Sequence, residues 1–175
     1  MTKVLFVRHG EPDYSTVGDW ANTPLGLNFA SLSDKGVRQI KLACKRLAYY
    51  DASIIISSPY TRTMQGAAIM SQKLNLPIMV EHDLHEWIVD TTFSTTDPEV
   101  LAELCREHDA CNGIYPNGEG KVWESTDIVR RRVLNCLKKY RRYKCIIVSG
   151  HAMMMQAVMG VNTMIGYGQI MELNL

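Results

Sequence analysis

Short apolar runs alternate along this chain with stretches in which apolar residues recur every three or four positions. The runs Val4–Val7, Ile54–Ile56 and Cys145–Val148 are short and continuous, which is typical of buried strands. Two weaker runs predict a short third strand at Pro77–Val80, counted along the chain, and a final edge strand at Ile170–Leu173.

Helical periodicity follows most of these strands. We expect helices after an N-cap signal at Ser33-Asp34, from Pro59 to Leu74, from near Asp97-Pro98, at Val122–Tyr140 and at Ala152–Met159. In the second of these helices, the residues expected to face inward are Met64, Ala67, Ala68 and Leu74. Apolar strands that alternate with helices indicate an α/β fold, a three-layer α/β/α sandwich with a mostly parallel central sheet.

The length of 175 residues fits one domain with a proper core. Between Glu81 and Lys121 the periodic pattern breaks up, apart from the helix near Asp97-Pro98. A loop-rich stretch of this length within a compact domain is more often functional than not. We therefore expect a single domain over residues 1–175, with a lid-like insertion at about 86–121.

Charge and composition exclude several classes of protein. The formal net charge is +1, so bulk electrostatics favour neither nucleic acid nor an anionic membrane as a partner. Apolar runs long enough to cross a bilayer and the features of a signal peptide are both missing, which favours a cytoplasmic protein. The five cysteines have no CxxC spacing, and most are expected to be small buried apolar residues.

Polar side chains follow the predicted strands. Arg8 and His9 come after the first strand, Arg62 soon after the second, Glu86 after the third and His151 after the fourth. The carboxyl ends of parallel strands lie at one edge of a sheet, where ligands bind. Two arginines and two histidines at one edge predict an anion site, because guanidinium groups hold phosphate or carboxylate with two bonds.

The first of these motifs also contains a glycine. In the tetrapeptide Arg8-His9-Gly10-Glu11, the glycine allows a sharp turn and a close approach of the backbone to a ligand. The imidazole of His9 can act as a nucleophile near neutral pH.

Six motifs together resemble one family. They are Val7–Glu11, Leu32–Gly36, Ser57–Thr63, Leu84–Trp87, Asn117–Glu119 and Val148–His151. In this order they are similar to those of the histidine phosphatase superfamily, the phosphoglycerate-mutase-like proteins, and they cover nearly the whole chain.

The resemblance implies a fold, an activity and a set of roles. His9 would accept the phosphoryl group, and Glu86 would protonate the leaving oxygen. The phosphate oxygens would be bound by Arg8, Arg62 and His151. The substrate would be a small phosphorylated molecule, and no metal or cofactor is implied.

Chemistry adds three expectations to these roles. A hydrogen bond from the second ring nitrogen, to a backbone carbonyl, should fix the tautomer of His9, and the bound anion should stabilise protonated His151. An acid must start protonated, so an apolar wall, for which Trp87 is a candidate, should favour the neutral form of Glu86.

Two departures favour a phosphatase over a mutase. Many mutases carry Asn where this chain has Ser15, and they are longer, with extra insertions around the substrate. Ala152 stands where the family often has Gly, a change that looks tolerable. The alternatives are a phosphoglycerate-mutase-type phosphotransferase and a module that binds a phosphorylated ligand without turnover.

Other interpretations compete at single residues. The role of the acid is open to Glu11, Asp13, Asp83 and Glu119 as well as to Glu86. A metal site could also be built from His82, Asp83, His85 and Glu86, although no further cluster supports it. The basic stretches Arg130–Arg132 and Lys138–Arg142 are better explained as a solvated helix face than as a nucleic-acid patch.

Substrate selectivity should come from the two loop-rich stretches Pro12–Ser31 and Trp87–Trp123. Their aromatic residues Tyr14, Trp20, Trp87 and Phe93 are candidates for packing on a substrate, or are simply loop anchors.

Overall fold

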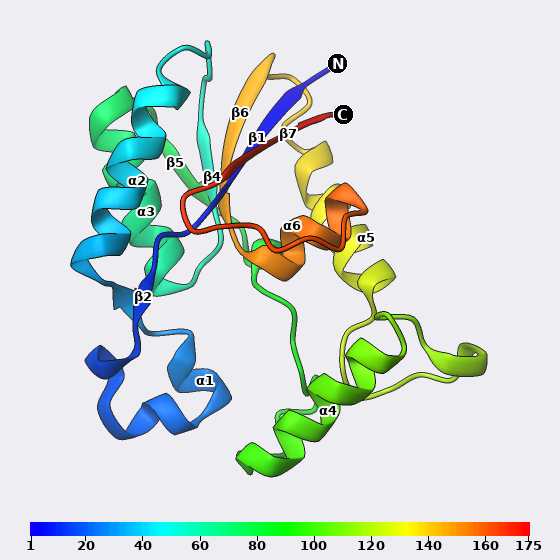
Figure 1. Cartoon of the computed structure of the whole chain (residues 1–175). Coiled ribbons are helices and arrows are strands. Elements are labelled where there is room, and N and C mark those ends of the chain that lie inside the picture. Colours follow the sequence, from blue (N-terminus) through cyan, green and yellow to red (C-terminus); the bar gives the residue numbers. More distant parts are fainter.

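The computed structural model describes the backbone of all 175 residues, and every side chain except those of residues 20–22, 24 and 25. Its main sheet has five strands in the order β5-β4-β6-β1-β7 (Figure 1). These strands are β1 (Lys3–Arg8), β4 (Ile55–Ser57), β5 (Ile78–Val80), β6 (Cys145–Gly150) and β7 (Ile170–Asn174). Only β7 is antiparallel to its neighbour, so the predicted α/β fold with a mostly parallel sheet is confirmed.

Helices cover both faces of this sheet. The pair α2 (Asp34–Leu47) and α3 (Thr61–Leu74) lies on one face, and α5 (Thr126–Lys138) and α6 (Ala152–Met159) lie on the other (Figure 1). None of the described helices is long and apolar enough to span a membrane.

The central strands supply the two halves of the core. In β1, Val4 and Phe6 pack toward α5 and α6, while Leu5 and Val7 pack toward α2 and α3. Successive side chains of a strand point to opposite faces, so a continuous apolar run is what a strand covered on both faces requires.

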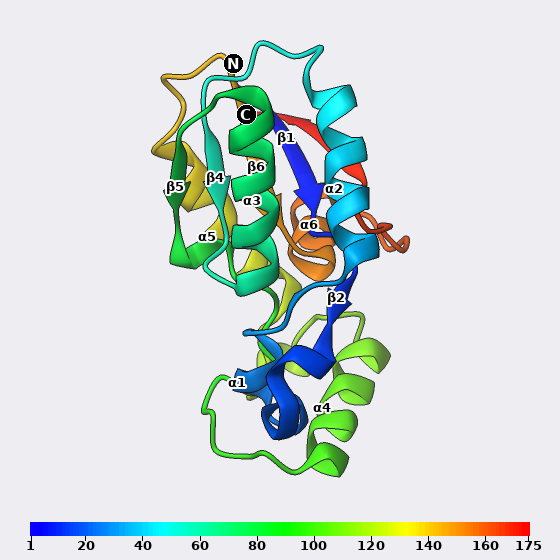
Figure 2. The same ribbon diagram turned by 90° about the vertical axis from the view of Figure 1, so that its left-hand side faces the viewer.

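The remaining elements are short or lie beyond the carboxyl ends of the parallel strands. They are β2 (Pro12–Asp13), η1 (Tyr14–Asn22), α1 (Pro24–Leu27), β3 (Ser31–Leu32), η2 (His82–Leu84), α4 (Pro98–Ala110) and η3 (Pro116–Gly118). Two views show α1 and α4 together below that edge of the sheet (Figures 1 and 2). Residues 86–121 include α4, and their role as a lid stays a prediction.

Two helices, α5 and α3, differ in part from the predictions. The sequence predicts that α5 starts at Val122, but the helix begins only after its N-cap Ser125. The residues before the cap are not helical because the backbone N–H of Glu124 donates to the carbonyl oxygen of Ile88. In α3, which begins at Thr61 after Pro59, the predicted inward residue Ala68 is exposed. The buried face of α3 instead contains Arg62, Thr63, Gly66, Ala67 and Met70.

The loop after β1 crosses the start of α2 at two glycines. A Cβ placed on Gly10 would lie 2.2 Å from the carbonyl oxygen of Gly36, and a Cβ on Gly36 would lie 2.2 Å from the carbonyl oxygen of Glu11. The close approach that was expected between Gly10 and a ligand is therefore, in this structure, an approach to backbone. This crossing fixes the segment that follows His9.

We expect Gly10→Ala to destabilise the protein by at least about 2 kcal/mol, because backbone atoms cannot move aside for the added methyl group. Urea unfolding measures the change. The matched control is Gly120→Ala, since a Cβ at Gly120 meets no atom within 4 Å. Equal stability of the two variants would show that the crossing is not tight.

Candidate active site

His9 lies at the end of β1 with its ring fixed by one backbone contact. Its Nδ1 is 2.7 Å from the carbonyl oxygen of Gly10. A carbonyl oxygen can only accept, so Nδ1 carries the proton and Nε2 is unprotonated, with an electron pair that can accept a hydrogen bond. This agrees with the tautomer expected from the sequence. The side chain is buried, with 5% of the residue exposed.

Arg62 joins the two histidines. It projects from the first turn of α3, and its Nε donates to Nε2 of His9 over 3.2 Å. Its Nη2 lies 3.4 Å from Nδ1 of His151, and its Nη1 donates to the carbonyl oxygen of Leu27 over 2.9 Å. His151 follows β6, and its Nε2 is 2.7 Å from Oγ of Ser58. The two imidazole centroids are 5.3 Å apart.

Burial and positive charge keep both imidazoles neutral. Burial first, and then the Arg62 guanidinium, lower the pKa of His9 to about 3. The same two causes, in the same order, hold the pKa of His151 well below its usual value. The positive charge that His9 and His151 both face is therefore that of Arg62. The stabilisation of protonated His151 by a bound anion stays a prediction.

Arg8 lies next to this pair. Its guanidinium carbon is 4.1 Å from the ring centroid of Tyr167, which in turn is 5.7 Å from the ring centroid of His9. Nη1 of Arg8 donates to the carbonyl oxygen of Ile165. Nε of Arg8 is buried without a hydrogen-bond partner among the described residues. An unpaired buried donor is costly, and an anion oxygen could satisfy it.

Glu86 caps the helix that follows His151. Its carboxylate accepts hydrogen bonds from the backbone N–H groups of Trp87 (2.9 Å), Met153 (3.2 Å) and Met154 (2.9 Å). These bonds tie the loop that carries Glu86 to the N-terminus of α6.

Trp87 lines the same cavity as Glu86, and its role as an apolar wall beside that carboxyl group stays a prediction. The indole N–H of Trp87 donates to the carbonyl oxygen of Glu124, and its ring packs 4.5 Å from that of His108.

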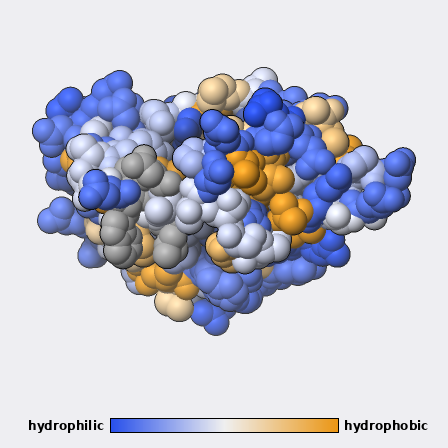
Figure 3. Space-filling view, turned by 90° about the horizontal axis from the view of Figure 1, so that it is seen from below, coloured by the Kyte–Doolittle hydropathy of each residue, from blue (hydrophilic) through white to orange (hydrophobic). Residues whose placement is uncertain are grey.

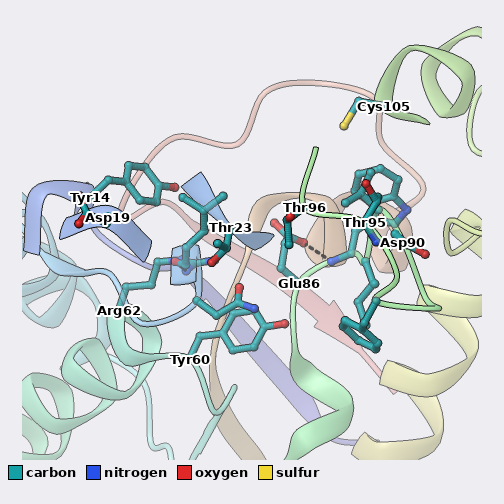
Figure 4. Close-up of a pocket in the computed structure, with 16 residues that line it drawn as sticks. Tyr14, Asp19, Thr23, Tyr60, Arg62, Glu86, Asp90, Thr95, Thr96 and Cys105 are labelled. Atoms are coloured by element: carbon teal, nitrogen blue, oxygen red, sulfur yellow. Dashed lines mark hydrogen bonds between the residues drawn. The ribbon is translucent and has the colours of Figure 1, made fainter. Parts of the chain in front are cut away.

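A cavity of about 850 Å³ opens beside Arg62 and Glu86 (Figure 4). In Figure 4, Tyr14, Tyr60 and Arg62 lie across the cavity from Asp90 and Thr95. Both loop-rich stretches contribute to its lining, as expected for the substrate site. The lining residues are Tyr14, Asp19, Thr23, Leu27, Asn28, Tyr60, Arg62, Glu86, Trp87, Ile88, Val89, Asp90, Phe93, Thr95, Thr96 and Cys105. The side chain of Trp20 lies outside the described residues.

The competing carboxylates lie elsewhere. Glu11 bonds to Lys35 (2.7 Å) and Ser33 (3.0 Å), and none of Glu11, Asp13, Asp83 and Glu119 belongs to the described lining of the cavity. Glu86 is the carboxylate of the predicted set that shares the cavity with Arg62.

The residues of the rival metal hypothesis have local partners. His82 pairs with Asp83 at 3.1 Å, and Nδ1 of His85 donates to the carbonyl oxygen of Glu86 over 2.7 Å. Among the described residues, no group of three or more His, Cys, Asp or Glu side chains is arranged to hold a metal ion.

Sequence reasoning missed the ion pair that holds the Glu86 loop. Arg132 contacts both carboxylate oxygens of the buried Glu124 at 2.9 Å. It also donates to the carbonyl oxygens of Asp83 (2.6 Å), His85 (2.9 Å) and Glu86 (3.2 Å). Arg132 was assigned to a solvated face, and that assignment is wrong. The available signal was its helical spacing, three residues after the buried Val129.

Comparisons with known proteins show the family of the chain. The family model described as histidine phosphatase superfamily (branch 1) matches residues 4–174. The chain is 28% identical over 149 residues to the uncharacterized phosphatase PhoE of Bacillus subtilis, which covers 85% of this chain and 72% of that protein. It is 33% identical over 86 residues to phosphoserine phosphatase 1 of Hydrogenobacter thermophilus, over 49% of this chain and only 39% of that protein.

Solved structures show the same fold. YhfR of Bacillus stearothermophilus matches with a TM-score of 0.76 at 16% identity, over 100% of this chain and 92% of that one. A mycobacterial glucosyl-3-phosphoglycerate phosphatase matches with a TM-score of 0.72 at 17% identity, over 99% and 90% of the two chains.

The low pKa of His9 makes stability depend on pH. Below the unfolded pKa of 6.5 the unfolded chain binds a proton at His9 that the folded chain does not bind until about pH 3. Stability therefore falls as the pH falls through this range. We therefore compare the free energy of unfolding at pH 7 and pH 5, measured by urea unfolding in phosphate-free buffer. Between these pH values we expect it to fall by about 2 kcal/mol less in His9→Gln than in the wild type.

The control is His82→Gln, which replaces an exposed imidazole and should follow the wild type. If the free energy of unfolding changed equally with pH in the wild type and in His9→Gln, the folded protein would accommodate a charged His9.

Proposed function

The chain belongs to branch 1 of the histidine phosphatase superfamily, and on this premise we propose that it is a metal-independent phosphatase that hydrolyses phosphomonoesters through a phosphohistidine at His9. The observation that carries the proposal is the contact between Nε2 of His9 and the guanidinium of Arg62, with His151 beside it. A neutral nucleophile next to a fixed cation suits attack on a phosphate dianion.

In the first step, the electron pair on Nε2 of His9 forms an N–P bond while the P–O bond to the leaving group breaks. The Nδ1–H bond to Gly10 supports this role, because it leaves Nε2 unprotonated and stabilises the positive charge that develops on the ring. In the second step, water attacks the phosphorus and passes a proton to the carboxylate that acted as the acid, the N–P bond breaks, and inorganic phosphate leaves.

Arg8, Arg62 and His151 bind the phosphate oxygens in this proposal. Phosphoryl transfer depends mainly on positioning and on neutralising charge on the equatorial oxygens, which two guanidinium groups supply without a metal. The unpartnered Nε of Arg8 supports its part in the site. A bound dianion also favours the protonated form of His151, whose Nδ1 faces Arg62 and whose Nε2 is held by Ser58.

Glu86 is the proposed acid that protonates the leaving oxygen. It lines the cavity with Arg62, where the alcohol part of the substrate would lie. Its hydrogen bonds from the backbone N–H groups of Met153 and Met154 hold the carboxyl group at the start of α6. The Arg132–Glu124 pair holds the backbone that carries Glu86, which supports a positioning role for that pair.

The intermediate can be trapped directly. After brief mixing with 4-nitrophenyl phosphate and a denaturing quench at alkaline pH, we expect a phosphoryl adduct on the peptide that contains His9, detected by mass spectrometry. Turnover should be insensitive to chelators and inhibited by vanadate. His9→Ala should lose both the adduct and hydrolysis, by at least about a thousandfold, because the nucleophile is gone.

His82→Ala is the control and should keep both. Full activity of His9→Ala, or activity that disappears with chelator, would contradict the proposal. A protein that binds phosphate but never forms the adduct would support the non-catalytic alternative, and an isomer instead of inorganic phosphate would support the mutase.

The role of Glu86 predicts a dependence on the leaving group. An alkoxide leaves poorly without a proton, whereas 2,4-dinitrophenolate needs none. We expect Glu86→Gln to lower kcat for an alkyl phosphate by about a hundredfold or more, and kcat for 2,4-dinitrophenyl phosphate by less than about fivefold. A loss that is equal for both substrates would indicate a structural role for Glu86 at the start of α6.

A further inference from the structure

The cavity that holds Arg62 and Glu86 has few positive groups. Among its described lining residues, Arg62 is the only Lys or Arg, while Asp19, Glu86 and Asp90 carry carboxylates. In the proposed function, Arg62 is already occupied by the phosphate. Any second negative group on a substrate would thus find no cation in the lining.

Much of the remaining lining is apolar. It includes Leu27, Trp87, Ile88, Val89 and Phe93, which come from both sides of the opening. Figure 3 views the molecule from the end where this cavity lies, and apolar surface interrupts the hydrophilic surface there. Transfer of an apolar group from water into such a lining is favourable.

The aromatic side chain of Phe93 projects from a loop whose backbone is held by hydrogen bonds. The buried carboxylate of Asp90 accepts hydrogen bonds from the backbone N–H groups of Thr92 (2.9 Å), Ser94 (3.0 Å) and Thr95 (3.2 Å). Phe93, inside this loop, has a φ of +53° and is 70% exposed.

A bulky residue rarely adopts a left-handed backbone, and a large apolar side chain gains nothing from water. The hydrogen bonds of Asp90 therefore hold Phe93 in a costly conformation that leaves its ring free to pack on a ligand. These bonds also occupy both oxygens of Asp90, so this carboxylate is part of the loop and is not a free anion toward the ligand.

We propose that this site selects phosphomonoesters whose alcohol part is uncharged and largely apolar, with the ring of Phe93 packed on it, and discriminates against alcohol parts that carry a carboxylate or a second phosphate. This inference rests on the proposed function. Selection against charged substrates follows because a carboxylate that enters the cavity loses water and gains no cation.

A matched pair of substrates tests the discrimination. 4-Ethylphenyl phosphate and 4-(carboxymethyl)phenyl phosphate have nearly the same size and similar leaving groups, and differ in one carboxylate. We expect kcat/KM to favour the uncharged ester by about tenfold or more. A ratio near one, or a preference for the carboxylated ester, would overturn the inference while leaving the proposed function in place.

Acetyl phosphate separates the two failures, because its leaving group is a small acetate that offers the cavity little to select. If the wild type hydrolyses neither aryl ester nor acetyl phosphate, the proposed function fails and the inference fails with it.

Two variants test whether the discrimination against the carboxylated ester arises in the cavity. Thr96→Lys adds a cation to the cavity lining. We expect it to raise kcat/KM for the carboxylated ester, and so to lower the ratio of kcat/KM between the uncharged and the carboxylated ester by at least about threefold. Gln72→Lys adds the same charge on an exposed position of α3 outside the lining and should leave the ratio unchanged. Equal effects of both variants would mean that the discrimination does not arise in the cavity.

Phe93→Ala tests the packing. We expect it to raise KM for 4-ethylphenyl phosphate by about tenfold, and Phe93→Leu to raise it less, because leucine restores most of the apolar contact. Circular dichroism checks that both variants fold as the wild type does. An unchanged KM in folded Phe93→Ala would remove Phe93 from the proposal.

Discussion

One guanidinium group, that of Arg62, joins the parts of this site. It donates to Nε2 of His9 at the end of β1, lies 3.4 Å from Nδ1 of His151 after β6, and donates to Leu27 in the loop-rich stretch beyond the sheet. Together with the burial of the two histidines, which is the larger cause, its positive charge lowers the pKa of both imidazoles. The proposed nucleophile, the proposed anion site and the edge of the cavity therefore all contact this side chain or lie beside it.

The sheet edge explains how much of the site could be predicted. Three continuous apolar runs and one weaker run marked the parallel strands, and residues that directly follow parallel strands meet at one edge. The position of Arg62 beside His9 follows from that rule. The contacts of Glu86 do not, because they depend on how the loop returns to the N-terminus of α6. The pair Arg132–Glu124 was hidden for a similar reason, since nothing local marks two charges that meet through a loop.

Sequence patterns also misplaced one helix start. The apolar residues Val122 and Trp123 extended the periodic pattern of α5 beyond its cap at Ser125. Trp123 is fully buried, but in an aromatic cluster with His108 and Tyr115 that joins α4 to the rest of the domain. The sheet therefore positions the chemical groups, and the segments beyond it shape the cavity that would contact the rest of a substrate.

A crystal structure of the protein with vanadate tests the central claim most directly. The account predicts a vanadium atom bonded to Nε2 of His9, with its equatorial oxygens bound by Arg8, Arg62 and His151, while Nδ1 of His9 stays bonded to the carbonyl oxygen of Gly10. Vanadate bound without contact to His9, or a His9 ring turned away from Arg62, would contradict it.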